Sequence, residues 1–213
     1  YGVEDPHRVG WNTSKLSESL NTEQVSSLSK DAYYVVVARL QKDNNTHKII
    51  EGYQKSGSTL PLVIIGDSLD DSYQDSLESL LRPEYQDRIL FTGGIYDLEI
   101  LNMLRQNSFA YLHGHSAGGT NPGLLEAMVM GSAVIAHNNP FNENVLDGNG
   151  LFFSNSHELS ELIIQLEGND EMRKNFSSNN RSRALGHYTW KRCMELHERS
   201  FRILLNRRKR TKL

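Results

Sequence analysis

The stretch HGHSAGGTNPGLLEAM, residues 113–128, gathers the residue types of this sequence that are best suited to binding a charged ligand. Asn121 is a favoured N-cap residue and Pro122 suits the first position of a helix, so we expect a helix to begin there. The unpaired backbone N–H groups and the positive dipole end of such a helix form an anion site. Gly118 and Gly119 lie just upstream, where the missing side chains let a ligand approach the backbone.

Glu126 adds a carboxylate to this stretch. It lies about one and a half turns into the expected helix, within reach of a ribose hydroxyl when phosphates rest on the helix end. Taken singly, a glycine pair before an N-cap is a turn and a helical glutamate is a solvated charge. Their order after a strand makes the combination more specific. It predicts a binding site for a nucleoside diphosphate, with the glutamate as an acidic anchor for the sugar.

His113 and His115 raise the question of a metal. We expect the two rings, two residues apart in an extended segment, to point to opposite faces, which is poor geometry for a shared ion. Clustered Cys or carboxylate ligands do not accompany them in the sequence. We therefore predict no metal site, and a contact from His115 to the sugar or phosphate of the ligand, with a hydrogen-bonded loop histidine as the alternative.

Arg39 directly follows the apolar run YYVVVA, residues 33–38. A guanidinium binds phosphate through two parallel hydrogen bonds, so an arginine at a strand end is suited to a diphosphate. The alternative for Arg39 is a surface ion pair.

The segment GGIYD, residues 93–97, follows another apolar run. Its glycines let a flat nucleobase lie against the backbone, where the amide and carbonyl of Ile95 can read the base edge. The predicted base contacts are Gly94, Ile95 and Tyr96.

The elements that must position these residues alternate along the chain. Runs of β-branched and aromatic residues predict six strands, at 33–38, 60–66, 88–93, 109–113, 132–137 and 150–153. Helical spacing of apolar residues separates many of them, as in 45–56, 72–81 and 97–107. This alternation predicts an α/β fold, a Rossmann-like doubly wound parallel sheet of about six strands with helices on both faces. Ligands of such sheets bind at the carboxyl ends of the strands, where Arg39 and the glycine pair lie.

Three parts follow from the composition along the chain. Residues 1–30 are polar and indicate a linker with at most one short helix, and residues 31–186 form the α/β domain. Residues 187–213 indicate a C-terminal helical extension, from about Trp190 to Asn206, and a basic tail. The tail is either a solvated end or attracted to anionic lipid, at about 1 kcal/mol per basic residue.

The whole chain has 213 residues, with 38% hydrophobic and 23% charged residues and a formal net charge of -3. This balance gives no reason to expect nucleic acid as a partner, because such proteins carry a basic face. Cys193 is the single cysteine, so no intrachain disulfide is possible and a reducing compartment fits. The expected location is therefore cytoplasmic, peripheral at the inner face of the plasma membrane if the tail binds lipid.

The blocks VARLQKDNN, LVIIGD, RILFTGGIYD, HGHSAGGTNPGLLEAM and NENVLDGNGLFF resemble the C-terminal, nucleotide-sugar-binding domain of GT-B glycosyltransferases of the retaining family 4. The resemblance covers roughly residues 33–153 and makes 31–186 the nucleotide-sugar-binding domain. The block at 113–128 is most similar to bacterial rhamnosyltransferases of capsule and exopolysaccharide assembly. The resemblance implies that an N-terminal Rossmann-like domain, absent here, holds the acceptor, and that Tyr1 falls at the interdomain linker.

By position, the resemblance places Arg39 on the diphosphate, Glu126 on the ribose and the Ile95 backbone on the base. Two positions depart from the family. Gly118 stands where the family has the first glutamate of its Glu, seven residues, Glu motif. Asn44 replaces a lysine, which leaves one phosphate cation fewer unless Lys42 reaches inward. Asn44 and Gly118 are nevertheless expected among the donor-binding residues.

These departures shift the expected donor contacts toward the backbone. The sugar and diphosphate are expected to rest on a short run of backbone amides, those of Gly119, Thr120 and Asn121.

The resemblance implies transfer of a hexosyl group, a rhamnosyl group in the branch it matches, from a nucleotide diphosphate sugar to a glycan or lipid-linked acceptor in cell-surface polysaccharide synthesis. The implied donor is dTDP-rhamnose, with a UDP- or GDP-sugar as the alternative. No cofactor is expected, because Arg39 and the helix end stabilise the leaving diphosphate without a protein-bound metal.

The residues also bear on three other functions. A non-catalytic nucleotide-sugar-binding module stays open because of the two motif losses. A Rossmann oxidoreductase is disfavoured because VVVARLQKDNN lacks the Gly-x-Gly-x-x-Gly turn. A receiver-like flavodoxin fold is disfavoured because no acidic cluster follows the first strand.

Overall fold

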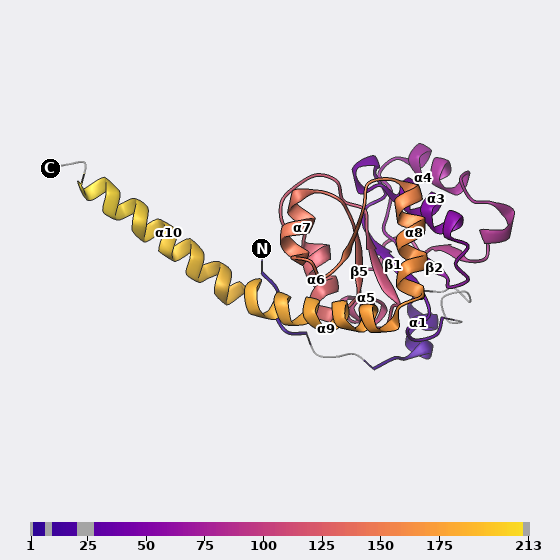
Figure 1. Ribbon diagram of the computed structural model, residues 1–213, viewed down its shortest axis with the longest axis horizontal. Helices are drawn as coiled ribbons and strands as arrows, with labels where there is room; N and C mark the ends of the chain where they lie inside the picture. The colour runs from indigo at the N-terminus through magenta and orange to yellow at the C-terminus, as the bar shows by residue number, and fades with distance from the viewer. Residues whose placement is uncertain (1, 7–9, 21–27, 211–213) are drawn as a thin grey trace.

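The computed structural model describes residues 2–6, 10–20 and 28–210 of the chain (Figure 1). Its centre is a six-stranded sheet in which every neighbouring pair is parallel, in the order β3-β2-β1-β4-β5-β6. The strands are β1 (Tyr34–Val37), β2 (Leu62–Ile65), β3 (Ile89–Phe91), β4 (Ala110–His113), β5 (Val134–His137) and β6 (Leu151–Phe153). The predicted doubly wound parallel sheet is confirmed.

Helices cover both faces of the sheet, because successive strand residues point to opposite sides. Tyr34 and Val36 pack into one apolar core and Val35 into the other. The core of Val35 is closed by α1 (Thr13–Leu20), α5 (Leu98–Gln106), α6 (Pro122–Met130), α7 (Pro140–Leu146) and α9 (Asp170–His187). The opposite core is closed by α3 (Thr46–Ser56), α4 (Asp71–Glu78) and α8 (Ser156–Glu167), with the 3-10 turn η2 (Pro83–Tyr85).

The strand order reverses between β1 and β4. From β1 the chain adds β2 and β3 on one side, then returns to add β4, β5 and β6 on the other. The loops that follow β1 and β4 therefore lead to opposite sides of the sheet and leave a crevice at its carboxyl edge. The loop after β1 carries Arg39 and the 3-10 turn η1 (Lys42–Asn44), and the loop after β4 carries the glycine pair.

The predicted start of the helix after β4 is confirmed. The side chain of Asn121 accepts hydrogen bonds from the backbone N–H groups of Gly123 and Leu124, at 2.8 and 3.4 Å. Pro122 occupies the first turn, where its fixed φ suits a helix. The helix ends at Gly131, whose φ of 81° is left-handed.

The N-terminal segment packs on the domain where it is described. Val3 and Leu16 are buried in the core, and the Val3 N–H donates to the Tyr188 carbonyl at 2.7 Å. Residue 1 and residues 7–9 and 21–27 of the predicted linker lie outside the described residues.

The C-terminal extension is a continuous helix, α10 (Trp190–Arg210), which is longer than the predicted helix. It projects away from the body of the molecule (Figure 1). Its exposed large apolar side chains are Trp190, Met194, Leu196, Phe201, Ile203, Leu204 and Leu205. Residues 211–213 of the basic tail lie outside the described residues. Within the described chain, none of the helices combines the length and apolar character that a membrane span requires.

Candidate functional site

The loops after β1 and β4 are joined by hydrogen bonds. The backbone N–H and the hydroxyl of Ser116 both donate to the Asp43 carbonyl, at 3.0 and 2.9 Å, and Asn45 Nδ2 donates to the Gly114 carbonyl at 2.8 Å. A Cβ at Gly114 would lie 2.0 Å from the carbonyl oxygen of Asn44, so only glycine fits there. These contacts bring the two predicted ligand-binding loops together at the reversal of the strand order.

Arg39 is exposed at the start of the first of these loops. It lines a pocket of about 300 Å³ together with the predicted base contacts Gly94, Ile95 and Tyr96. It also lines a smaller pocket of about 160 Å³ with Lys42, so that lysine lies on the same side of the loop. No ion-pair partner of Arg39 is found in the part of the chain that the structure describes. The guanidinium is therefore open to a ligand.

Asn44 holds the turn that carries Arg39. Its side chain is 2% exposed, and its Nδ2 donates to the Arg39 carbonyl at 2.7 Å. The amide that replaces the family's lysine is thus engaged inside the loop, which differs from the donor contact expected of it.

The loop of residues 94–96 is held by Asp67, which follows β2. The Gly94 N–H donates to Asp67 Oδ1 and the Tyr96 hydroxyl to Oδ2, each at 2.6 Å, and this hydrogen bond raises the pKa of Tyr96. Ile95 packs against the core, whereas the Tyr96 ring is 86% exposed. The sequence reasoning missed Asp67, although its place directly after an apolar strand is the same signal that identified Arg39.

Residues 118–120 of the loop after β4 are exposed, and we call them the glycine loop. Gly118 has a φ of 102°, a conformation that side chains other than glycine rarely adopt, and no heavy atom lies within 4 Å of the position a Cβ would take. The family's glutamate is therefore disfavoured at Gly118 by the backbone rather than by lack of space.

The expectation of unpaired N–H groups in the first turn of α6 is wrong for Gly123 and Leu124. The Asn121 cap takes both, and Pro122 has no N–H. An anion at this helix end is left with the backbone amides that precede the turn, those of Gly119, Thr120 and Asn121.

The expectation that His113 and His115 point to opposite faces is also wrong. Their rings stack, with centroids 4.6 Å apart and an interplanar angle of 11°, and Tyr111 continues the stack at 5.9 Å. Side chains alternate along an extended chain, so residues two apart share a face. Among the described residues, no three or more His, Cys, Asp or Glu side chains are grouped to hold a metal ion.

Burial keeps these histidines neutral near pH 7. It lowers the pKa of His113 well below the ordinary value of 6.5, and the neighbouring His115 and His137 lower it further. Burial also lowers the pKa of His115, and the charge of Arg39 adds to that effect. His115 therefore lies within the electrostatic reach of Arg39, as a neutral imidazole beside the candidate phosphate cation.

Glu126 lines a different pocket, of about 410 Å³, formed by residues 2–6, α5, α6 and Trp190 of α10. Its side chain is 32% exposed, and its Oε2 lies 2.6 Å from Nη2 of Arg105, a side chain that is 2% exposed. Leu98, which begins α5 just after the 94–96 loop, lines the same pocket. Of the predicted site residues, Arg39 and residues 94–96 thus line one pocket and Glu126 lines another. The sequence reasoning missed Arg105.

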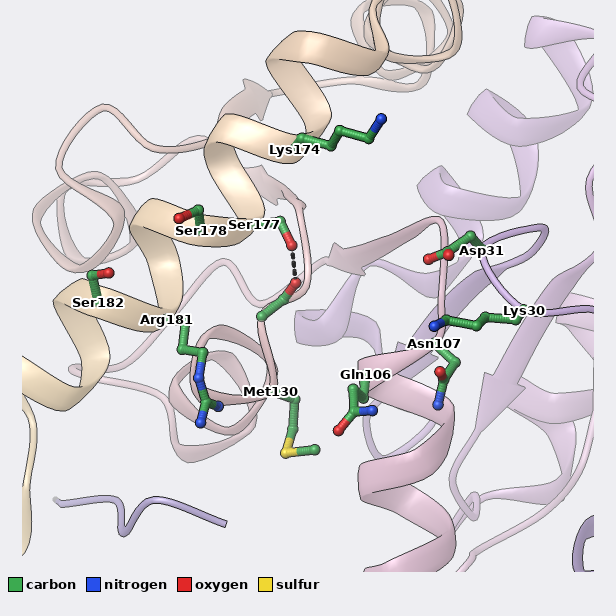
Figure 2. Close-up of a pocket in the computed structure, with 11 residues that line it drawn as sticks. Lys30, Asp31, Gln106, Asn107, Met130, Lys174, Ser177, Ser178, Arg181 and Ser182 are labelled. Carbon is green, nitrogen blue, oxygen red and sulfur yellow. Dashed lines mark hydrogen bonds between the residues drawn. The ribbon is translucent and has the colours of Figure 1, made fainter. Parts of the chain in front are cut away.

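A third pocket, of about 370 Å³, lies at the opposite, amino edge of the sheet (Figure 2). Two of its three cations are engaged by the protein itself, since Lys174 pairs with Asp170 at 2.5 Å and Arg181 with Asp5 at 2.6 Å, whereas Lys30 has no ion-pair partner among the described residues. The Ser177 hydroxyl donates to the Gly131 carbonyl, the dashed line of Figure 2. Ligands of open α/β sheets bind at the carboxyl edge, and none of the predicted site residues lines this pocket.

Known proteins share the sequence pattern and the fold. The chain is 28% identical over 183 residues to an uncharacterised glycosyltransferase of Methanocaldococcus jannaschii, an alignment that covers 80% of this chain and 45% of that protein. The fold matches that of Anabaena HepE, solved in complex with UDP, with a TM-score of 0.74, 18% identity, and coverage of 91% of this chain and 52% of the other.

The C-terminal domain of a group 1 glycosyl transferase, LpcC from Francisella tularensis, matches with a TM-score of 0.69 and 18% identity over 85% of this chain and 100% of that domain. The chain therefore spans about half the length of the longer relatives it matches. The sequence profile of the family described as "Glycosyl transferases group 1" matches residues 19–183. Because that match takes in most of the chain, from the end of α1 into α9, this protein belongs to the group 1 family of glycosyl transferases.

Proposed function

We propose that this chain is the donor-binding half of a glycosyltransferase that moves a hexosyl group, specifically a rhamnosyl group, from a nucleotide diphosphate sugar to a glycan or lipid-linked acceptor. One observation carries the proposal. Arg39, exposed and without an ion-pair partner in the described chain, lies at the carboxyl end of β1, on a loop that is hydrogen-bonded to Gly114 and Ser116, just before the glycine loop. An available arginine on a loop joined to a glycine-rich segment is suited to a diphosphate.

Arg39 is the proposed catalytic residue. When the bond between the sugar and the diphosphate breaks, negative charge gathers on the leaving diphosphate, and a guanidinium already in place stabilises that charge as it develops. Lys42 lies beside Arg39 and supplies part of the charge that the family's lysine would bring. The amides of Gly119 and Thr120 complete the cradle. This division of roles demands neither a nucleophilic carboxylate nor a metal of this domain.

The nucleoside is proposed to lie between the 94–96 loop and α6. The backbone of Ile95 reads the base edge, in a loop that Asp67 holds in place. Glu126 accepts a hydrogen bond from a ribose hydroxyl at the second pocket. His115, neutral beside Arg39, contacts the sugar or the phosphate as a hydrogen-bond partner.

The donor is proposed to be dTDP-rhamnose, with a UDP- or GDP-sugar as the alternative. The complexes of Anabaena HepE with UDP and with UDP-glucose support a nucleotide diphosphate sugar as the class. In this proposal residues 31–186 bind the donor, residues 1–30 are the linker, and a further N-terminal domain binds the acceptor for cell-surface polysaccharide synthesis. No cofactor is included.

Thermal unfolding of the chain with dTDP, UDP and GDP at millimolar concentration tests the donor site. A ligand at about 100 times its Kd adds about 2.7 kcal/mol, which raises Tm by roughly 5–10 °C for a chain of this size. The absence of any shift with all three nucleotides would contradict the proposal.

A non-catalytic nucleotide-sugar-binding module is the second candidate, favoured by one observation. The backbone at Gly118 disfavours the glutamate that the family places on the donor sugar. The full-length gene product, assayed with a panel of nucleotide sugars and acceptors, separates the two candidates. Transfer of a sugar supports the enzyme, whereas tight donor binding without transfer or donor hydrolysis supports the module.

The C-terminal helix is proposed to contact an anionic membrane at the inner face of the plasma membrane, with the protein otherwise cytoplasmic. Trp190, Met194, Phe201 and Leu204 are exposed at helical spacing on one side of α10. Basic residues outnumber acidic ones along the helix and dominate its end. An apolar face beside basic side chains is typical of helices that lie in a lipid interface.

Co-sedimentation with phosphatidylglycerol vesicles tests this contact, with phosphatidylcholine vesicles as the control. Binding is expected to be stronger to the anionic vesicles, to weaken in salt, and to fall when residues 207–213 are deleted. Equal sedimentation of the full and the shortened chain would assign the tail to solvent.

A further inference from the structure

Arg105 is one of the largest fully buried side chains of the protein. It lies in α5 with 2% of its surface exposed, and its Nη2 is 2.6 Å from Oε2 of Glu126. Its Nε and Nη1 have no hydrogen-bond partner among the described residues. The hydroxyls of Ser108 and Ser132 both donate to the Arg105 carbonyl at 2.9 Å, which fixes the backbone of this residue. The guanidinium is thus held in the interior with the Glu126 carboxylate as its ion-pair partner.

Stability does not account for this pair. Burying a guanidinium whose donors are partly unpaired costs free energy. Buried ion pairs replaced by apolar residues of similar volume often leave a protein equally or more stable. The surroundings of Arg105 on α5 are apolar, since Met103 and Leu104 are fully buried beside it. A methionine or leucine would suit such a position at least as well.

The two partners of the pair differ in exposure, and that difference lets the buried partner orient the exposed one. Arg105 is inside, whereas the Glu126 side chain is 32% exposed and lines the pocket of about 410 Å³. A glutamate on a helix surface samples several rotamers, and a buried partner at 2.6 Å selects one of them. A carboxylate fixed before a ligand arrives loses less freedom on binding.

We propose that Arg105 is a positioning residue that holds the Glu126 carboxylate in the orientation that receives a sugar hydroxyl of the nucleotide. Through Glu126 it sets how strongly the protein prefers nucleotides that carry those hydroxyls. The inference rests on the proposed function, in which Glu126 contacts the ribose. Arg105 itself does not touch the nucleotide, because its side chain is buried beneath Glu126.

The experiment compares each of dTDP, UDP and GDP with its 2′,3′-dideoxy counterpart by calorimetric titration. The ratio of the two Kd values isolates the hydroxyl contact. The native chain is expected to bind the hydroxyl-bearing nucleotide about tenfold or more tightly, as for a hydrogen bond to a charged group. Arg105→Met is expected to reduce the ratio to about twofold or less while the Kd of the dideoxy nucleotide stays the same. Arg105→Lys is expected to restore most of the ratio, because it returns the buried cation.

Two further variants separate positioning from general damage. Arg183→Met removes an arginine that binds the Val145 carbonyl and Asp147, away from Glu126, and is expected to keep the native ratio. In the double variant Arg105→Met with Glu126→Leu, the ratio is expected to equal that of Glu126→Leu alone. If Arg105→Met does not fold, Arg105→Gln is measured instead, since its amide keeps much of the length without the charge.

The outcomes are distinct. A folded Arg105→Met or Arg105→Gln chain that keeps the native ratio overturns the inference and leaves Arg105 a structural cation. A native ratio near one overturns it as well, together with the ribose contact, but leaves the diphosphate site standing. Failure of the native chain to bind any of the nucleotides contradicts the proposed function itself.

Discussion

The two edges of the sheet both carry a pocket and positive charge, but they use the charge differently. At the amino edge Lys174 and Arg181 pair with Asp170 and Asp5. At the carboxyl edge Arg39 has no ion-pair partner in the described chain. The pockets are similar in size, about 370 and 300 Å³. Lys30 at the amino edge also lacks an ion-pair partner among the described residues. The comparison therefore teaches that an available arginine, which can bind phosphate through two parallel hydrogen bonds, distinguishes the candidate anion site at the carboxyl edge.

The edges also differ in how their loops are held. At the carboxyl edge, side chains of the loop after β1 and the loop after β4 bond to each other's backbone, as Asn45 does to Gly114 and Ser116 to Asp43. The glycine loop beyond these contacts stays exposed. The two loops are thus held together next to the strands, whereas the glycine loop remains accessible, which is suited to a ligand-binding loop.

The sharpest test of the comparison removes one cation from each edge of the sheet. Arg39→Ala is expected to raise the Kd of a nucleoside diphosphate about 10- to 100-fold, because charge-assisted hydrogen bonds contribute about 1.5–3 kcal/mol. The free energy of unfolding should change little, since Arg39 is exposed. Calorimetric titration with the diphosphate and with the nucleoside measures the effect. An equal loss for both ligands would refute the role of Arg39 on the diphosphate.

Lys174→Ala is the matched variant at the amino edge. It should leave the Kd unchanged and change the free energy of unfolding by less than about 1 kcal/mol, because Lys174 makes an exposed ion pair with Asp170. A loss of nucleotide affinity in this variant would erase the difference between the two edges.

The next test addresses the contact between the loops after β1 and β4. Gly114→Ala places a Cβ 2.0 Å from the Asn44 carbonyl oxygen, and such overpacking costs about 1–3 kcal/mol. Gly119→Ala meets open space and is expected to stay within about 0.5 kcal/mol of the native chain. Urea denaturation measures both. Similar losses in the two variants would mean that the loops are not locked at Gly114.

The smallest expected effect concerns the buried histidines below this edge. The folded state holds the pKa of His113 well below its ordinary value, so between that lowered pKa and about 6.5 only the unfolded chain binds the proton. The free energy of unfolding therefore decreases as pH falls below about 6.5. His113→Gln should remove about 1 kcal/mol of the decrease between pH 7 and 5.5. His115 and His137 are lowered in the same direction and retain the remainder.

Much of the architecture could be predicted from local patterns. Runs of β-branched and aromatic residues marked all six strands, and the Asn-Pro step at 121–122 marked the start of α6. These signals are carried by neighbouring residues and depend little on the rest of the fold. The same holds for the stack of His113 and His115, which the period of two of an extended chain predicts when applied correctly.

The contacts that organise the site depend on tertiary packing. Arg105, on a helix with mixed polarity, has the pattern of a surface arginine, and only the packing of α5 against α6 buries it against Glu126. Asp67 and the 94–96 loop meet because β2 and β3 are neighbours in the sheet. Asn44 could not be assigned to the inside of its turn from its type alone, since asparagine is common on either side of a loop.

The φ of 102° at Gly118 has a consequence for the history of the family. A single base change can convert a glycine codon into a glutamate codon, so the family's usual residue is close at hand genetically. The folded loop opposes that change, because the new side chain would meet a backbone it rarely tolerates. Descendants of this chain would need to reshape the loop before the glutamate became acceptable. A Gly118→Glu change is thus expected to strain the loop in its present conformation.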